Sequence, residues 1–160
     1  MKTEKQLKEL LSSIKANHWK IPEGVEPYEL SMECLNYIGT IDLVLRDYLI
    51  YDWFCEVIMN NKLSHEQMRG ILESCLTEQH LLCGVGKVED DSVFNRTFTM
   101  LVIELILEKD NMAGEAFLSE REVRKTYQKV MEYAKSEQDF RGYVEEKGWA
   151  HSTAHMADTL

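Results

Sequence analysis

The sequence contains few residues that interrupt helices, with two prolines and eight glycines among 160 residues. Proline breaks a helix interior and glycine weakens it, so this scarcity leaves room for long helices. Isolated strands are also missing, because the short β-prone pieces at 44–45 and 102–103 lie inside longer helical periods. We therefore expect an all-α protein.

An excess of basic residues is missing as well, since the formal net charge is −10. Nucleic acids and anionic membranes select basic surfaces, so we expect neither as a partner. The most apolar stretch, residues 93–107, is shorter than a bilayer span and contains Arg96 and Glu104. The N-terminus is charged and lacks the apolar stretch of a secretory signal. These features predict a cytoplasmic protein.

The four cysteines, Cys34, Cys55, Cys75 and Cys83, form no CxxC pair, and we expect them to be reduced and buried. A zinc site of Cys75, Cys83 and His80 is the alternative, although its spacing matches no structural zinc motif. The phosphate-loop and nucleophile-elbow motifs are absent, and nothing marks a Cys/His dyad. We therefore expect a binding protein rather than an enzyme.

Apolar residues at helical spacing predict about seven helices. Two of them, at 41–60 and 92–109, are apolar on most faces and need neighbours on several sides. The length fits one domain, residues 1–160. The other predicted helices are 4–16, 27–38, 64–76, 119–136 and a tail helix that carries His151, His155 and Asp158. Capping boxes at Ser64/Gln67 and Ser119/Glu122 begin two of them, and Asp90 or Asp91 caps helix 92–109.

A weak internal repeat relates the second half of the chain to the first. L-S-x-x-x-M-R at 63–69 matches L-S-x-x-x-V-R at 118–124, and a unit of roughly 40–50 residues is typical of HEAT or armadillo repeats. We expect a right-handed stack of antiparallel helix pairs, with N-terminal helices in 1–40 and repeats in 41–160. Under this alignment Arg46, Arg96 and His151 occupy related places.

Several phrases occur together in the second half. They are L-R-D-Y at 45–48, G-V-G at 84–86, D-S-V-F-x-R-x-F at 91–98, R-G-Y-V-E at 141–145, K-G-W-A-H at 147–151 and A-H-x-A-D at 154–158. In this order they resemble the bacterial family catalogued as domain of unknown function 2785, from about residue 42 onward. The resemblance implies an all-helical cytoplasmic bacterial protein and supplies no activity. Family members continue past the His-rich helix, so we expect this chain to be either a short member or a piece of a longer protein.

Polar and aromatic residues stand where a helical scaffold needs neither, and we expect them to bind a protein, a peptide or a small anionic ligand. These residues are Arg96, Arg141, Trp149, His151 and His155. A guanidinium inside an apolar helix requires a partner. One interpretation is a polar ridge for a ligand, made by Arg46, Arg96 and His151. The alternative is that the two arginines form internal ion pairs. The expected ion-pair partners are a nearby carboxylate for Arg46, and Glu104 or Asp91 for Arg96.

A metal site is the second hypothesis, with His151, His155 and Asp158 as ligands of a divalent ion. Residues three or four apart on a helix have Cβ atoms about 5–6 Å from each other, which suits two imidazoles on one ion. Ser152 stands where zinc proteases carry glutamate, so a protease is excluded and a metal-binding protein or another hydrolase is left. Plain packing of the histidines is the alternative. A third hypothesis is a homodimer through the C-terminal helices.

Overall fold

The computed structural model describes residues 2–112, 114 and 116–159, with the backbone alone for Asp158. It is mostly helical, as the composition predicts. The helices are α1 (Glu4–Ala16), α2 (Pro27–Leu35), α3 (Leu43–Leu45), the π-helix η1 (Arg46–Tyr51), α4 (Asp52–Met59), α5 (His65–Cys75), α6 (Ser92–Asn111), α7 (Glu120–Ser136) and α8 (Ser152–Thr159).

One small sheet corrects the expectation that no strand is present. Strands β1 (Tyr143–Val144) and β2 (Gly148–Trp149) pair antiparallel, with Tyr143 opposite Trp149. Each strand is too short to show the alternation of apolar and polar residues that identifies strands from sequence. The link that we expected to enter the last helix is therefore a β-hairpin.

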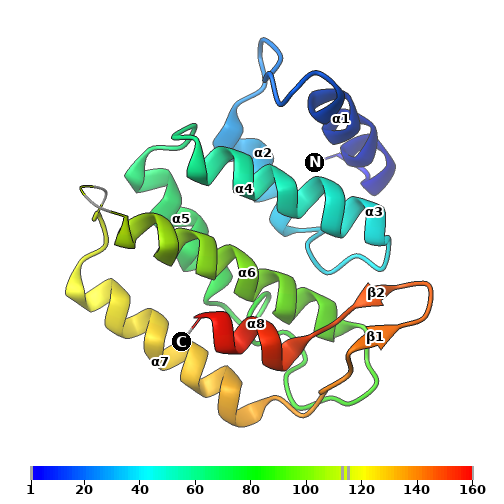
Figure 1. Cartoon of the computed structure of the whole chain (residues 1–160), viewed down its shortest axis with the longest axis vertical. Coiled ribbons are helices and arrows are strands. Elements are labelled where there is room, and N and C mark those ends of the chain that lie inside the picture. Colours follow the sequence, from blue (N-terminus) through cyan, green and yellow to red (C-terminus); the bar gives the residue numbers. More distant parts are fainter. Residues whose placement is uncertain (1, 113, 115, 160) are drawn as a thin grey trace.

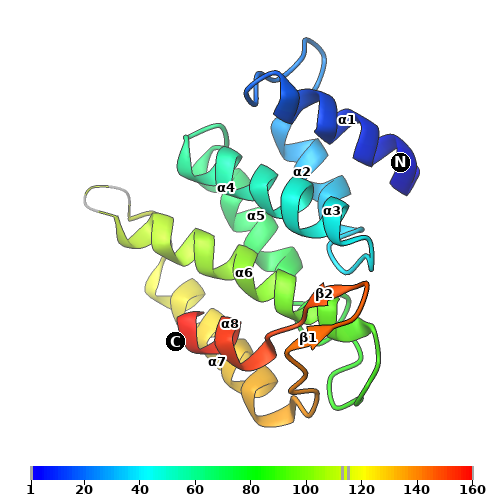
Figure 2. The same cartoon turned by 45° about the vertical axis from the view of Figure 1, so that its right-hand side comes forward.

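The helices follow one another in two rows (Figures 1 and 2). The first row contains α1, then α3, η1 and α4, then α6, then α8, and the second contains α2, α5 and α7. Contacts within the first row join α1 to η1, α4 to α6, and α6 to α8, while α2 touches α5 in the second. The expected helix at 41–60 is present as the continuous series α3, η1 and α4.

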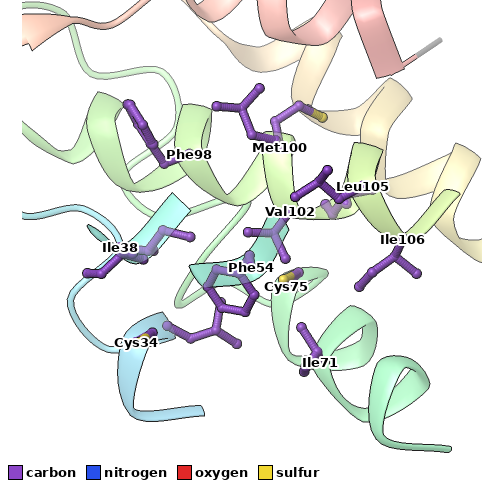
Figure 3. Packing of buried hydrophobic residues seen from close by; sticks show 14 of the residues in the cluster. Cys34, Ile38, Phe54, Ile71, Cys75, Phe98, Met100, Val102, Leu105 and Ile106 are labelled. Carbon is purple, nitrogen blue, oxygen red and sulfur yellow. The ribbon is translucent and has the colours of Figure 1, made fainter. Parts of the chain in front are cut away.

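The core lies between the two rows, and α6 is its central element (Figure 3). This helix packs against α4, α5 and α8, which explains why its sequence is apolar on most faces. Around it, Phe54 of α4 and Cys75 of α5 are fully buried. All four cysteines are free, with two of them buried and two half-buried. Within the described residues, no helix has the length and apolarity that crossing a bilayer requires.

Side-chain caps fix where the helices begin. The boxes at Ser64/Gln67 and Ser119/Glu122 are confirmed. Before α6, the Asp91 side chain makes no cap hydrogen bond, whereas the Asp90 carboxylate accepts one from the backbone N–H of Ser92 at 2.9 Å. Asp91 instead forms an ion pair with a lysine of the hairpin, so the start of α6 is tied to the C-terminal part of the chain.

Candidate functional site

The tail, residues 137–159, folds back along α6 and carries most of the residues expected to bind a ligand (Figure 1). Its first anchor is a buried ion pair. Arg96 of α6 is fully buried and donates to both carboxylate oxygens of Glu137, from Nε at 2.7 Å and from Nη2 at 3.0 Å. Its Nη1 donates to the Cys83 carbonyl at 2.7 Å and to the Ser92 hydroxyl at 2.8 Å. The partner is Glu137, not the expected Glu104 or Asp91.

The second anchor is Arg46, which is also fully buried. Its Nη2 donates to the carbonyl of Lys147 in the hairpin at 2.6 Å, and its Nε lies 2.8 Å from the Asp47 carboxylate. The guanidinium carbon lies 4.3 Å from the ring centroid of Phe94 and 4.5 Å from that of Phe98. Arg46 and Arg96 therefore form no exposed ridge, and both hold the tail against the helices.

The third anchor is Arg141. Its Nε and Nη2 donate to the carboxylate of Asp139 at 2.8 and 2.7 Å, and Nη2 also donates to the Asp90 carbonyl. Burial acts to raise the pKa of the Asp139 carboxyl, but the hydrogen bonds from Arg141 outweigh it and lower that pKa below its ordinary value. The same bonds raise the pKa of Arg141. This guanidinium is thus charged and already compensated.

Beyond these anchors, the tail presents an aromatic surface that we define as Tyr143, Trp149, His151 and His155. The Trp149 and His151 rings stack in parallel, with centroids 4.2 Å apart and an angle of 2° between their planes. Tyr143 meets the Trp149 indole edge-on at 5.2 Å, and His155 lies 6.0 Å from His151. Tyr143 and Trp149 are 58% and 49% exposed, whereas His151 and His155 are half-buried, so the two larger rings are the part of this surface that is open to solvent.

His151 lies one residue before α8, which corrects the expectation that the helix carries both histidines. Its φ is 50°, in the left-handed region, and its carbonyl accepts from the backbone N–H of His155 at 3.1 Å. A non-glycine residue held there costs about 1 kcal/mol or more. The backbone N–H of His151 donates to the Arg141 carbonyl, so the hairpin holds the ring on Trp149 through this conformation.

The metal hypothesis stays a prediction. His151 and His155 lie beside each other at 6.0 Å between ring centroids, but the Asp158 side chain lies outside the described residues. Within the part of the chain that is described, no group of three His, Cys, Asp or Glu side chains is placed to hold an ion, and this includes Cys75, Cys83 and His80.

The structure therefore divides the five predicted ligand residues into two groups. Trp149, His151 and His155 come together, whereas the guanidiniums of Arg96 and Arg141 point into carboxylates of the tail. The sequence interpretation missed Tyr143, the edge-on neighbour of Trp149. The available signal was its spacing of six residues from Trp149 around a short polar turn, which fits a hairpin.

The model of one family, described as protein of unknown function (DUF2785), matches residues 81–160, which is half of the chain and includes α6, α7 and the whole tail. No curated protein and no solved structure matches the chain.

Proposed function

We propose a function for this chain, which belongs to the DUF2785 family. It is a binding module, and its aromatic surface receives a segment of a protein or peptide partner. The observation that carries this proposal is a stacked aromatic surface, with Tyr143 and Trp149 about half exposed, on a tail fixed by the buried ion pair of Arg96 with Glu137. Exposed aromatic side chains on a rigid support are typical of binding hot spots.

The scaffold in this proposal is a HEAT-like stack of helix pairs. The two rows of helices support it, because successive pairs in such a stack contact mainly their neighbours. The free cysteines support a reducing compartment, and we propose that the protein works in the cytoplasm.

A protein or peptide is a better partner than a small anion. An anion needs an uncompensated positive charge, and the guanidiniums of Arg96 and Arg141 lie within 2.7 Å of carboxylates. In this proposal the two arginines position the aromatic surface and do not touch the partner.

The test compares a double variant of the aromatic surface with a double variant of exposed side chains on α7. Trp149→Ala/His151→Ala removes the centre of the surface, while Val123→Ala/Tyr127→Ala removes exposed apolar side chains of α7, 42% and 58% exposed. Both variants should keep the helical far-ultraviolet dichroism of the wild type. Crosslinking in cell lysate should capture the same partner with the wild type and the α7 variant, and lose it with the tail variant.

A tail variant that unfolds, or that captures the partner as well as the wild type does, would contradict the proposal. If the partner is a second copy of the chain, sedimentation will show a dimer for the wild type and a monomer for the tail variant. That outcome would support the homodimer through the C-terminal elements.

A further inference from the structure

The geometry points to the chemistry of the partner: the segment that lies on the aromatic surface carries a cationic side chain, arginine or lysine. This inference rests on the proposed function and names the class of group that the surface receives. It comes from three observations, namely exposed aromatic rings, exposed carboxylates in the turn of the same hairpin, and the way this chain places its own cations.

The open rings provide the attraction. An aromatic face attracts a guanidinium or an ammonium group within about 6 Å of its centroid, and tryptophan is the strongest of the aromatic side chains in this role. Stacking on His151 covers one face of the Trp149 indole and fixes its plane, and the Tyr143 ring packs against the indole at an angle of 71°. A partner cation therefore meets rings that need no rearrangement, which lowers the entropy cost of binding.

Exposed carboxylates provide the charge. Glu145 and Glu146 form the turn of the same hairpin and are exposed, and neither carboxylate takes part in any hydrogen bond or ion pair found among the described residues. Glu145 directly follows β1, so both carboxylates belong to the turn that joins the strands carrying Tyr143 and Trp149. The nearby Lys147 is paired with Asp91 at 2.7 Å, so the uncompensated charge at this end of the hairpin is negative.

The chain uses the same combination twice for its own cations. The Arg46 guanidinium lies over the rings of Phe94 and Phe98, with the Asp47 carboxylate at 2.8 Å. Lys15 similarly lies near two rings, those of Trp19 and Tyr48 at 5.9 and 5.8 Å, with a carboxylate of Asp52 at 2.6 Å.

The hairpin presents the same two kinds of group at the surface. Tyr143 and Trp149 are the ring pair, and Glu145 and Glu146 are the carboxylates. The cation that completes the arrangement would come from the partner, and the net charge of −10 favours the approach of a basic segment.

The probe for the test is the synthetic peptide acetyl-Gly-Arg-Gly-Arg-Gly-amide. Its control replaces both arginines with citrulline, which has the same shape without the charge. Binding is followed by nuclear magnetic resonance through the indole N–H signals of ¹⁵N-labelled protein. The chain has three tryptophans, and the Trp149 signal is assigned by its loss in Trp149→Phe.

The arginine peptide should shift the Trp149 signal of the wild type saturably. Trp149→Ala, whose binding is followed through the backbone amide signals of the hairpin, should bind the peptide about fivefold more weakly. The variant Glu145→Gln/Glu146→Gln should weaken binding about threefold at low salt, with the difference disappearing at high salt. The charge-matched control is Glu73→Gln/Glu132→Gln on α5 and α7, and it should bind like the wild type.

Equal binding of the arginine and citrulline peptides, or equal loss in both charge variants, would overturn the cation inference. No shift with the arginine peptide would overturn it as well. The proposed function would still stand in these cases if Trp149→Ala/His151→Ala abolished capture of the cellular partner. The peptide experiment therefore tests the cation inference, and the capture experiment tests the proposed function independently of it.

Discussion

Replacement of Glu137 by alanine removes the carboxylate that neutralises Arg96, and it should be among the most destabilising changes in the tail. Glu137 is 6% exposed and Arg96 fully buried, so water cannot take over the lost contacts. The carboxylate also accepts the backbone N–H groups of Gln138 and Asp139, each at 2.9 Å. Removal therefore leaves one buried cation and two backbone donors without their partner.

Loss of one member of a buried ion pair costs about 3–5 kcal/mol of unfolding free energy, because the other charge stays buried and uncompensated. For a chain of this length each kcal/mol lowers the melting temperature by about 2–4 °C, so Tm should fall by about 10 °C. Urea denaturation at pH 7, followed by far-ultraviolet dichroism, measures the free energy directly.

The matched control is Glu73→Ala. Glu73 is paired with Lys125 at 3.6 Å, with both side chains more than half exposed, and its loss should cost no more than about 0.5 kcal/mol. The double variant Arg96→Met/Glu137→Ala removes both charges and should cost clearly less than the sum of the two single variants. Additive losses, or a cost below about 1 kcal/mol for Glu137→Ala, would refute the reasoning.

Four further predictions concern other parts of the chain. Gly148→Ala should lower the free energy of unfolding in urea by about 2–3 kcal/mol, because φ is +88° and the new Cβ would lie 3.0 Å from the buried Arg46 guanidinium. The control Gly24→Ala has a similar φ of +79° but no atom within 4 Å of the new Cβ, and it should cost only about 1 kcal/mol. Ser31→Ala should cost about 1–3 kcal/mol by calorimetry, since it orphans the fully buried indole N–H of Trp53, and a neutral result would contradict this role. Burial lowers the pKa of His80 below 6.5 despite a hydrogen bond with Asn95. As the pH drops below 6.5, His80 therefore takes up a proton in the unfolded state before it does so in the folded state, and the free energy of unfolding falls. His80→Gln should flatten this fall in urea titrations between pH 7 and 5. Protein purified without a nickel column should contain no stoichiometric metal and show no rise in Tm with zinc, and a molar equivalent of metal would favour the histidine site instead.

Most of the helical framework could be predicted from local sequence. The capping boxes at Ser64 and Ser119 and the apolar periods fixed where α5 and α7 begin. The hairpin could not be predicted in this way, because its pairs form between residues six apart in pieces too short to show a period. The position of His151 before α8 depends on that hairpin.

The candidate site was likewise predictable from the sequence only in part. The composition of the tail alone pointed to Trp149, His151 and His155, and these three side chains do meet. The roles of the arginines depended on distant partners, since Arg96 pairs with Glu137 across 41 residues and Arg46 bonds to Lys147 across 101. No local pattern encodes such a pairing, so an arginine in an apolar helix is equally consistent with a ligand site and with an internal anchor.

The sequence by itself determined the helical class, the helix starts and the segment in which a site would lie, because propensity, capping and periodicity act over a few residues. Only the tertiary structure decided which charged groups are compensated. Burial of Arg46 and Arg96, and the pairing of Arg96 with Glu137, depend on how the tail folds back along α6. With those charges compensated, the exposed aromatic rings and the two glutamates of the hairpin are what we propose the tail presents to a partner.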